Sequence, residues 1–339
     1  MRQPDKQQVS IQKVLRDHFL GAQKQNSKQI SRRMNNRLVV VLLCCNIGLV
    51  ICEKQEQQIV DEDLLGLDQF DDRLSKALLE KIIVHPSKLD ELYNFTKPIH
   101  RLELQGQFEQ PIIINRQIFK NRIKNGFFIE AGAYDGEAFS NSLFYELKLN
   151  WTGILVEANP DAFKELKSKH RKSWLLGHCL STQNQSEIVD FDASGLLGGI
   201  IHQGKKPGVD QVSGDVIKSF GGSVVIPGAQ DLFPYQRRTI QTQCFPLYSI
   251  LKAVGNPTVH YFSLDVEGSE LPILKTIPFD KVDIKVLDIE IKNAGQIFPG
   301  SYREITKFMY SQGYEFFTQV SDVDAIYVKK GYLNELNEL

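Results

Sequence analysis

The chain has 339 residues, of which 42% are hydrophobic, and its formal net charge is −1. This length accommodates one large domain or two small ones, and the apolar content suffices for a globular core. A nearly neutral chain gives no electrostatic reason to bind nucleic acid, so we expect no nucleic-acid partner.

The N-terminal region divides into three segments by charge. Basic residues predominate in 1–37, the uncharged run LVVVLLCCNIGLVIC occupies 38–52, and acidic residues predominate from Glu53 to Glu80. We interpret 1–37 as a disordered cytosolic tail and 38–52 as a signal-anchor transmembrane helix. Such a helix is only about 22 Å long, against ~30 Å for the hydrocarbon core. The apolar region of a cleaved signal peptide and a buried core element are therefore alternatives.

The basic flank predicts the topology of the chain. Positive residues stay in the cytosol, so the C-terminal body is expected in the lumen, as in a type II membrane protein. Cleavage before Glu53 would instead secrete it. Three glycosylation sequons agree with a lumenal body: Asn94-Phe-Thr, Asn150-Trp-Thr and Asn184-Gln-Ser.

Two of the five cysteines, Cys179 and Cys244, lie in the body, and the other three lie in the apolar run. In an oxidising compartment we expect these two to form one disulfide, with two buried free thiols as the alternative. No CxxC motif or histidine cluster accompanies them, which argues against zinc, and we predict no metal site.

Residues 53–109 are predicted to be a lumenal stem. Apolar residues at helical spacing indicate an amphipathic helix over about 62–84, which we expect to pack on the following domain. A coiled-coil stalk is the alternative, but the repeat is short. The residues that carry this pattern are Leu67, Phe70, Leu74, Leu78 and Ile82.

From about residue 110, patterns typical of strands alternate with patterns typical of helices. Together they predict a domain over 110–331 with a mostly parallel, doubly wound sheet closed by an antiparallel hairpin, followed by a tail at 332–339. A polar, glycine-rich stretch at 193–240 is interpreted as a long insertion with a flap. Strands are expected at 126–132, 152–158, 259–268 and 282–291, and helices at 139–148 and 160–170.

Three segments carry the candidate chemistry. The first expected strand ends in the glycine turn Glu130-Ala131-Gly132-Ala133-Tyr134-Asp135-Gly136. Glycine there permits a tight turn and close approach of a ligand, and a helix N-terminus beyond it favours an anionic group. A glycine turn alone is weak evidence, because many Rossmann-like folds have one.

The second segment is ILVEANP, which places Glu157 at the end of the next strand. An acid there can accept hydrogen bonds from both ribose hydroxyls of a nucleoside. A solvated strand-end acid is the alternative, but the glycine turn and Glu157 together favour nucleoside binding.

The third segment is FSLDVEGSE, with Asp265, Glu267 and Glu270 at the carboxyl end of a strand. Clustered acids there can bind a cation, act as a base or contact a ligand ammonium group. A turn acid and helix-capping charges are the alternative. Glu290 ends the next strand and faces either the same crevice or the rim of the core.

The strings FFIEAGAYDGE, GILVEANP and FSLDVEGSE, in this order, resemble the FkbM-type S-adenosylmethionine (SAM) methyltransferase domain over about 110–330. The strings SNSLFYEL, SWLLGHCLS and QCFPLYSIL also resemble the arthropod Star-like branch of membrane proteins. The resemblance implies a Rossmann-like α/β methyltransferase fold with an N-terminal membrane segment.

The resemblance also implies SAM as cofactor and assigns roles to individual residues. Glu157 would hold the ribose, Ala158 and Asn159 would flank the adenine, and Asp265 and Glu267 would face the transferred methyl as the catalytic pair. The residues that would line the methionine part are Glu130, Gly132, Tyr134, Asp135 and Gly136.

Two functions are compatible with these features. An O-methyltransferase acting on a sugar or other hydroxyl acceptor would use Asp265 as its base. The Star-like resemblance implies instead the trafficking of EGF-receptor ligand precursors, as protein cargo, from the endoplasmic reticulum to the Golgi and endosomes. We favour trafficking as the biological role, because SAM is made in the cytosol whereas the expected topology places the domain in the lumen.

Overall fold

The computed structural model describes residues 60–102, 104–207, 209–213, 216–219, 222–225 and 238–338. The expected cytosolic tail and apolar segment, and part of the expected flap, lie outside the described residues. Within the described part of the chain, no helix is long and apolar enough to cross a membrane.

The chain divides into two compact units. The larger comprises Gln58–Asp210 with Tyr235–Leu339. The smaller, Met1–Gln57 with Gln211–Pro234, is described only in its strands. The strands β7 (Val209–Ser213), β8 (Val216–Ser219) and β9 (Gly222–Val225) form a three-stranded sheet, in which β8 and β9 are antiparallel.

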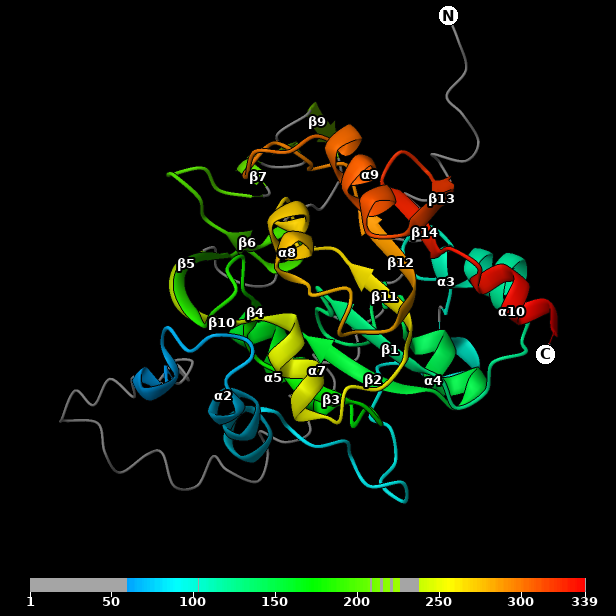
Figure 1. The fold of residues 1–339 in the computed structure, drawn as a ribbon. Helices are drawn as coiled ribbons and strands as arrows, with labels where there is room; N and C mark the ends of the chain where they lie inside the picture. Colours follow the sequence, from blue (N-terminus) through cyan, green and yellow to red (C-terminus); the bar gives the residue numbers. More distant parts are fainter. Residues whose placement is uncertain are drawn as a thin grey trace, which may run out of the picture. The chain divides into compact units, whose positions relative to one another are not determined.

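A seven-stranded sheet lies at the centre of the larger unit (Figure 1), in the order β13-β14-β12-β11-β1-β2-β3. Its first five strands in chain order run parallel, and the last two add an antiparallel hairpin. The mostly parallel α/β sheet predicted from the sequence is confirmed, and it is consistent with a Rossmann-like methyltransferase. The strands are β1 (Phe127–Ala131), β2 (Thr152–Val156), β3 (Trp174–Leu176), β11 (Val259–Leu264), β12 (Ile284–Glu290), β13 (Tyr314–Val320) and β14 (Asp324–Lys329).

Alternation of side chains along the strands creates two apolar cores. Ile129 of β1 joins the core that contains side chains of α2 (Asp72–Ala77), α7 (Leu247–Ala253), α8 (Glu270–Thr276) and α9 (Tyr302–Ser311). Phe128 joins the core on the opposite face, which includes side chains of α3 (Gln110–Ile114), α4 (Leu143–Leu149), α5 (Pro160–Ser168) and α10 (Tyr332–Glu338). We call these the first and second faces of the sheet. Strand β1 is buried along its whole length.

The part of the expected stem around residues 64–83 packs on the first face. Leu64, Leu74 and Leu78 are buried in the same core as Ile129. The helix expected over 62–84 is broken, because Gly66 adopts φ +74° and its N–H donates to the carbonyl of Ser186. Its pieces are a 3₁₀ turn at Glu62–Leu64, α2, and a π-helical turn at Leu78–Ile82.

Two further elements differ from the sequence-based expectation. The helix expected from residue 139 begins only at Leu143, because the preceding residues turn to contact β1. The expected C-terminal tail contains α10, which buries Tyr332 and Leu336 against the second face.

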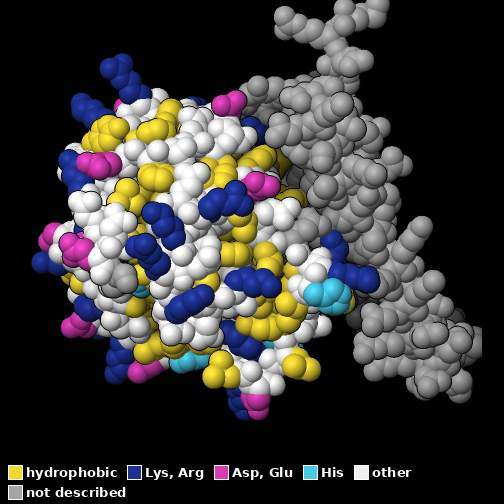
Figure 2. Space-filling model, turned by 90° about the vertical axis from the view of Figure 1, so that its right-hand side faces the viewer, with side chains coloured by type: hydrophobic (Ala, Val, Ile, Leu, Met, Phe, Trp, Pro, Cys, Tyr) yellow, Lys and Arg dark blue, Asp and Glu magenta, His cyan; other side chains and the backbone are white. Residues whose placement is uncertain are grey.

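Figure 2 shows one side of the molecule, where basic side chains are interspersed with acidic and apolar ones.

A smaller sheet has the order β4-β10-β5-β6. It contains β4 (Cys179–Leu180), β5 (Glu187–Ala193), β6 (Gly199–Ile200) and β10 (Arg238–Phe245). Cys179 and Cys244 are register partners on β4 and β10, and a disulfide joins them. The two cysteines are 65 residues apart in the sequence, so the bond closes the chain across the 193–240 insertion.

Removal of this disulfide should destabilise the larger unit. Closure of a long loop restricts the unfolded chain and is commonly worth about 2–4 kcal/mol. We expect the double variant Cys179→Ser/Cys244→Ser to lose that much in free energy of unfolding by denaturant titration. Mass spectrometry of unreduced peptides should recover the linked pair. Free labelling of both thiols in the folded protein would contradict the pairing.

Candidate functional site

Acidic side chains cross the second face of the sheet near the carboxyl ends of its parallel strands. Glu130 of β1 is in register with Ser263 of β11, which is in register with Asp288 of β12. Two residues further along β12, Glu290 is opposite Asp324 of the neighbouring strand β14. All five are buried. Because ligands of open α/β sheets bind at this edge, we take it as the candidate site.

Glu130 is hydrogen-bonded to the loop before α4. Its carboxylate accepts hydrogen bonds from Ser140 Oγ at 2.9 Å, from the Asn141 N–H at 2.6 Å and from Ser142 Oγ. Burial raises its pKa, and the positive charge of Arg171 opposes that shift. The residue therefore holds the loop that follows the glycine turn.

The glycine turn packs against the chain segment that follows β11. Gly132 has φ +89°, and a Cβ atom there would lie 2.1 Å from the carbonyl oxygen of Asp265. The Asp265 N–H also donates to the carbonyl of Ala131 at 3.1 Å. The close approach that glycine permits is thus an approach to the chain's own backbone. A larger residue at 132 would disturb the fold, so it is a poor test of ligand binding.

The rest of the turn is fixed by local hydrogen bonds. Tyr134 is buried and has φ +49°, and Asp135 accepts from the N–H groups of Glu137 and Ala138 at 2.9 and 2.7 Å. A Cβ atom at Gly136 would lie 2.3 Å from Leu166 Cδ1 of α5. The turn is therefore fixed between β1 and α5.

Glu157 connects the glycine turn to the end of β2. Its carboxylate accepts from the Tyr134 N–H at 2.8 Å and from the Asn159 N–H at 2.6 Å. Burial raises its pKa to about 7. Each carboxylate oxygen has a second lone pair, so the ionised group still has acceptor capacity for a hydroxyl.

Asn159 lies beside Glu157 with one unused donor. Its side-chain oxygen caps α5 by accepting from the Asp161 N–H at 3.0 Å. Its Nδ2 is buried, and no described group accepts a hydrogen bond from it. An unsatisfied buried donor costs free energy, so this amide is suited to an acceptor atom of a ligand. The neighbouring Ala158 is also buried.

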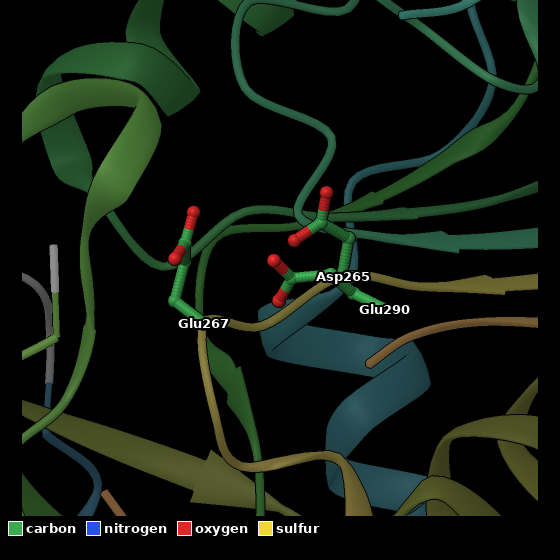
Figure 3. A group of neighbouring side chains, drawn as sticks. All are labelled: Asp265, Glu267 and Glu290. Carbon is green, nitrogen blue, oxygen red and sulfur yellow. The ribbon is translucent and has the colours of Figure 1, made fainter. Parts of the chain in front are cut away.

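Three carboxylates converge beside the glycine turn. One oxygen each of Asp265, Glu267 and Glu290 lies within 4.8 Å of the other two, and Figure 3 shows the Glu290 carboxyl group below that of Asp265 and directed toward Glu267. We call this group the acid triad. Asn293 connects two of its members, because Nδ2 donates to Glu267 Oε2 at 2.6 Å and to Glu290 Oε1 at 2.9 Å.

The strand expected over 259–268 ends early, at Leu264, because the loop that carries Asp265 and Glu267 turns sharply. Glu267 has φ +56° and Gly268 has φ +99°, a conformation that favours glycine. Glu270 accepts from the N–H groups of Val266 and Gly268, both at 3.1 Å. Glu270 therefore anchors the turn, and Glu267 is held in a left-handed conformation toward Glu290.

Burial makes the triad reluctant to ionise. It raises the pKa of Asp265 to about 8, and the charges of Asp324 and Glu270 add to the shift. The pKa values of Glu267 and Glu290 rise well above their usual range for the same main reason. Asp265 keeps part of its surface exposed, so we expect water to moderate its shift. Among the described residues, no lysine or arginine forms an ion pair with the triad.

Fold and site together define a protein of the methyltransferase type, with a glycine turn, a strand-end acid and acids at the carboxyl edge of a parallel sheet. The model of the methyltransferase FkbM domain matches residues 130–316, which is more than half of the chain. The chain therefore belongs to the FkbM methyltransferase family. The matched region begins at Glu130 and includes Glu157 and the acid triad. No curated protein matches the chain.

The raised pKa values predict how stability depends on pH. Acids with folded pKa values of about 7 to 8 bind more protons in the folded than in the unfolded state, so stability falls as pH rises through that range. His178, with a pKa lowered to about 4, contributes the opposite slope only below its unfolded value of 6.5. We expect the melting temperature in EDTA to fall between pH 6.5 and 8.5, by roughly 2–4 °C per kcal/mol lost.

The matched variants for this measurement are Asp265→Asn and Glu315→Gln. The first removes a partly buried titrating acid and should flatten the fall, whereas the second changes an exposed acid of β13 and should leave the fall unchanged. A melting temperature that is constant or rises over this pH range would contradict the account.

Proposed function

We propose that this domain binds SAM at the carboxyl edge of the sheet and transfers its methyl group to a hydroxyl acceptor. The observation that carries the proposal is the buried Nδ2 of Asn159, which has no described acceptor and lies beside Glu157. The two side chains offer a donor suited to a ring nitrogen of adenine and a carboxylate suited to the ribose hydroxyls.

The residues around this edge fit the other parts of the cofactor. SAM, when bound, supplies an electrophilic methyl group on a positively charged sulfur. The acid triad, when ionised, offers negative charge to that sulfur and to an ammonium group. Asp265, with its pKa raised to about 8, is able to take the proton of the acceptor hydroxyl as the oxygen attacks the methyl. Glu130 does not contact the cofactor in this proposal, but its hydrogen bonds hold the loop before α4 in place.

Asn159→Asp tests cofactor binding while it keeps the side-chain cap of α5. The aspartate keeps the oxygen that caps α5 and replaces the buried donor with an acceptor. We expect its affinity for SAM to fall about 10-fold or more by calorimetric titration of the full-length protein, because a hydrogen bond and its geometry are lost. The matched control is Asn184→Asp, which makes the same amide-to-carboxylate substitution at an exposed residue. If the native protein gives no heat with SAM, or Asn159→Asp binds as the native protein does, the proposal fails.

We further propose that the body faces the lumen of the secretory pathway, as a type II protein of the endoplasmic reticulum, Golgi or endosome, or as a secreted protein after signal cleavage. Methyl transfer in the lumen would require SAM imported from the cytosol. The disulfide supports this compartment, and so do Asn94, Asn150 and Asn184, which are all exposed. The Star-like resemblance adds the trafficking of EGF-receptor ligand precursors as a second function of the same fold. In that case Asn159→Asp should leave cargo export unchanged.

Glycosylation in animal cells tests the topology. We expect the protein to lose apparent mass on treatment with an N-glycan-removing enzyme, and Asn94→Gln, Asn150→Gln and Asn184→Gln to show which sites are used. Protease protection in sealed microsomes is the parallel measurement. An unglycosylated body that protease digests in sealed microsomes would place it in the cytosol instead.

A further inference from the structure

The acid triad brings together three carboxyl groups, and the described chain supplies little positive charge to compensate them when they ionise. Glu267 and Glu290 are buried, Asp265 is partly buried, and the exposed Lys292 is a described cation whose charge acts on Asp265 and Glu267. Like charges at this separation repel strongly away from bulk water, so the ionised triad requires a counter-charge.

One oxygen of the triad points to a ligand independently of the cluster. Glu290 is 4% exposed, and its Oε2 is buried with no hydrogen-bond donor among the described groups. Its other oxygen accepts from Asn293 Nδ2, which also holds Glu267. The orientations of both carboxylates are thus fixed, while one buried lone-pair site is left for another partner.

We propose that Asp265, Glu267 and Glu290 bind one hard divalent cation of the Ca²⁺, Mn²⁺ or Mg²⁺ class, with Asn293 orienting two of the three carboxylates. Carboxylate oxygens are the ligands that these ions prefer, and three carboxylates leave a net charge of −1 once a divalent ion is bound. A fixed amide behind the ligands is the usual arrangement around a protein-bound metal.

The spacing of the oxygens agrees with this assignment. Oxygens on opposite sides of a Ca²⁺ ion, each about 2.4 Å from it, are about 4.8 Å apart, and for Mg²⁺ the corresponding separation is about 4.2 Å. The observed spread, within 4.8 Å, accommodates the larger ion as it stands and the smaller after a slight contraction. Further ligand positions would be open to water or to an acceptor hydroxyl.

Binding of the cation does not require SAM. The role of the cation in methyl transfer, however, rests on the proposed function. With the ion bound, Asp265 is a ligand, and the ion takes over activation of the acceptor hydroxyl by lowering its pKa. The proton of the bound hydroxyl then passes to bulk water instead of to Asp265. Because the metal test uses no SAM, its failure is distinguishable from failure of the proposed methyl transfer.

Binding of Mn²⁺ to the full-length protein, freed of metal by EDTA and dialysed, is the test. Free Mn²⁺ is measured by electron paramagnetic resonance. We expect one Mn²⁺ per chain, displaced by Ca²⁺ or Mg²⁺, and at least a 10-fold weaker site in Glu290→Gln. Asp324→Asn is the matched control, because it changes a neighbouring buried acid that is opposite Glu290 but outside the triad. It should keep the site.

Thermal melting separates loss of the site from loss of the fold. Without metal, Glu290→Gln should melt at a higher temperature than the native protein, because one buried acid is removed from a repelling group. Mn²⁺ should raise the melting temperature of the native protein and of Asp324→Asn but not of Glu290→Gln. Absence of Mn²⁺ binding to the native protein, or equal binding by Glu290→Gln, would overturn the proposal.

Discussion

The architecture of the site depends on the contact between Gly132 and the backbone carbonyl of Asp265. A side chain at 132 would place a carbon 2.1 Å from that oxygen, so only glycine lets the turn after β1 lie directly on the segment after β11. This contact brings the two loops together at one edge of the sheet. Glu157 then connects the same turn to β2, and Glu290, at the end of β12, lies close to Asp265 and Glu267. Because the strands are parallel, their carboxyl ends lie at the same edge of the sheet. Because Gly132 has no side chain, the loops after β1 and β11 can touch there.

Buried acids in a sheet are costly, and the domain satisfies most of theirs with hydrogen bonds. Glu130 is bonded by the loop before α4, Asp324 accepts from Gln110 Nε2 at 2.7 Å, and Asp288 accepts from Tyr261 Oη at 2.6 Å. One oxygen of Asp288 and one of Glu290 have no described partner, and only the second belongs to a convergent group. The acid triad therefore includes one buried oxygen, Glu290 Oε2, that is left without a described hydrogen-bond donor.

Local patterns in the sequence predicted the strands and the acids that end them, because buried parallel strands are continuous apolar runs and their ends carry the polar residues. The roles of individual side chains depend on distant partners and were not predictable. Glu270 is adjacent to the triad in sequence yet bonds its own turn, and Asn293, absent from every motif, joins Glu267 to Glu290. The helix expected over 62–84 is broken at Gly66 by a bond to Ser186, which no local pattern contains.

The central claim is that the carboxyl ends of β1, β2, β11 and β12 form one ligand site. A crystal structure with S-adenosylhomocysteine and Mn²⁺, recorded at a wavelength where manganese scatters anomalously, tests it most directly. The account predicts adenosine against Glu157 and Asn159, and one anomalous peak among Asp265, Glu267 and Glu290. Adenosine bound at another edge of the sheet, or an acid triad without manganese at saturating concentration, would contradict it.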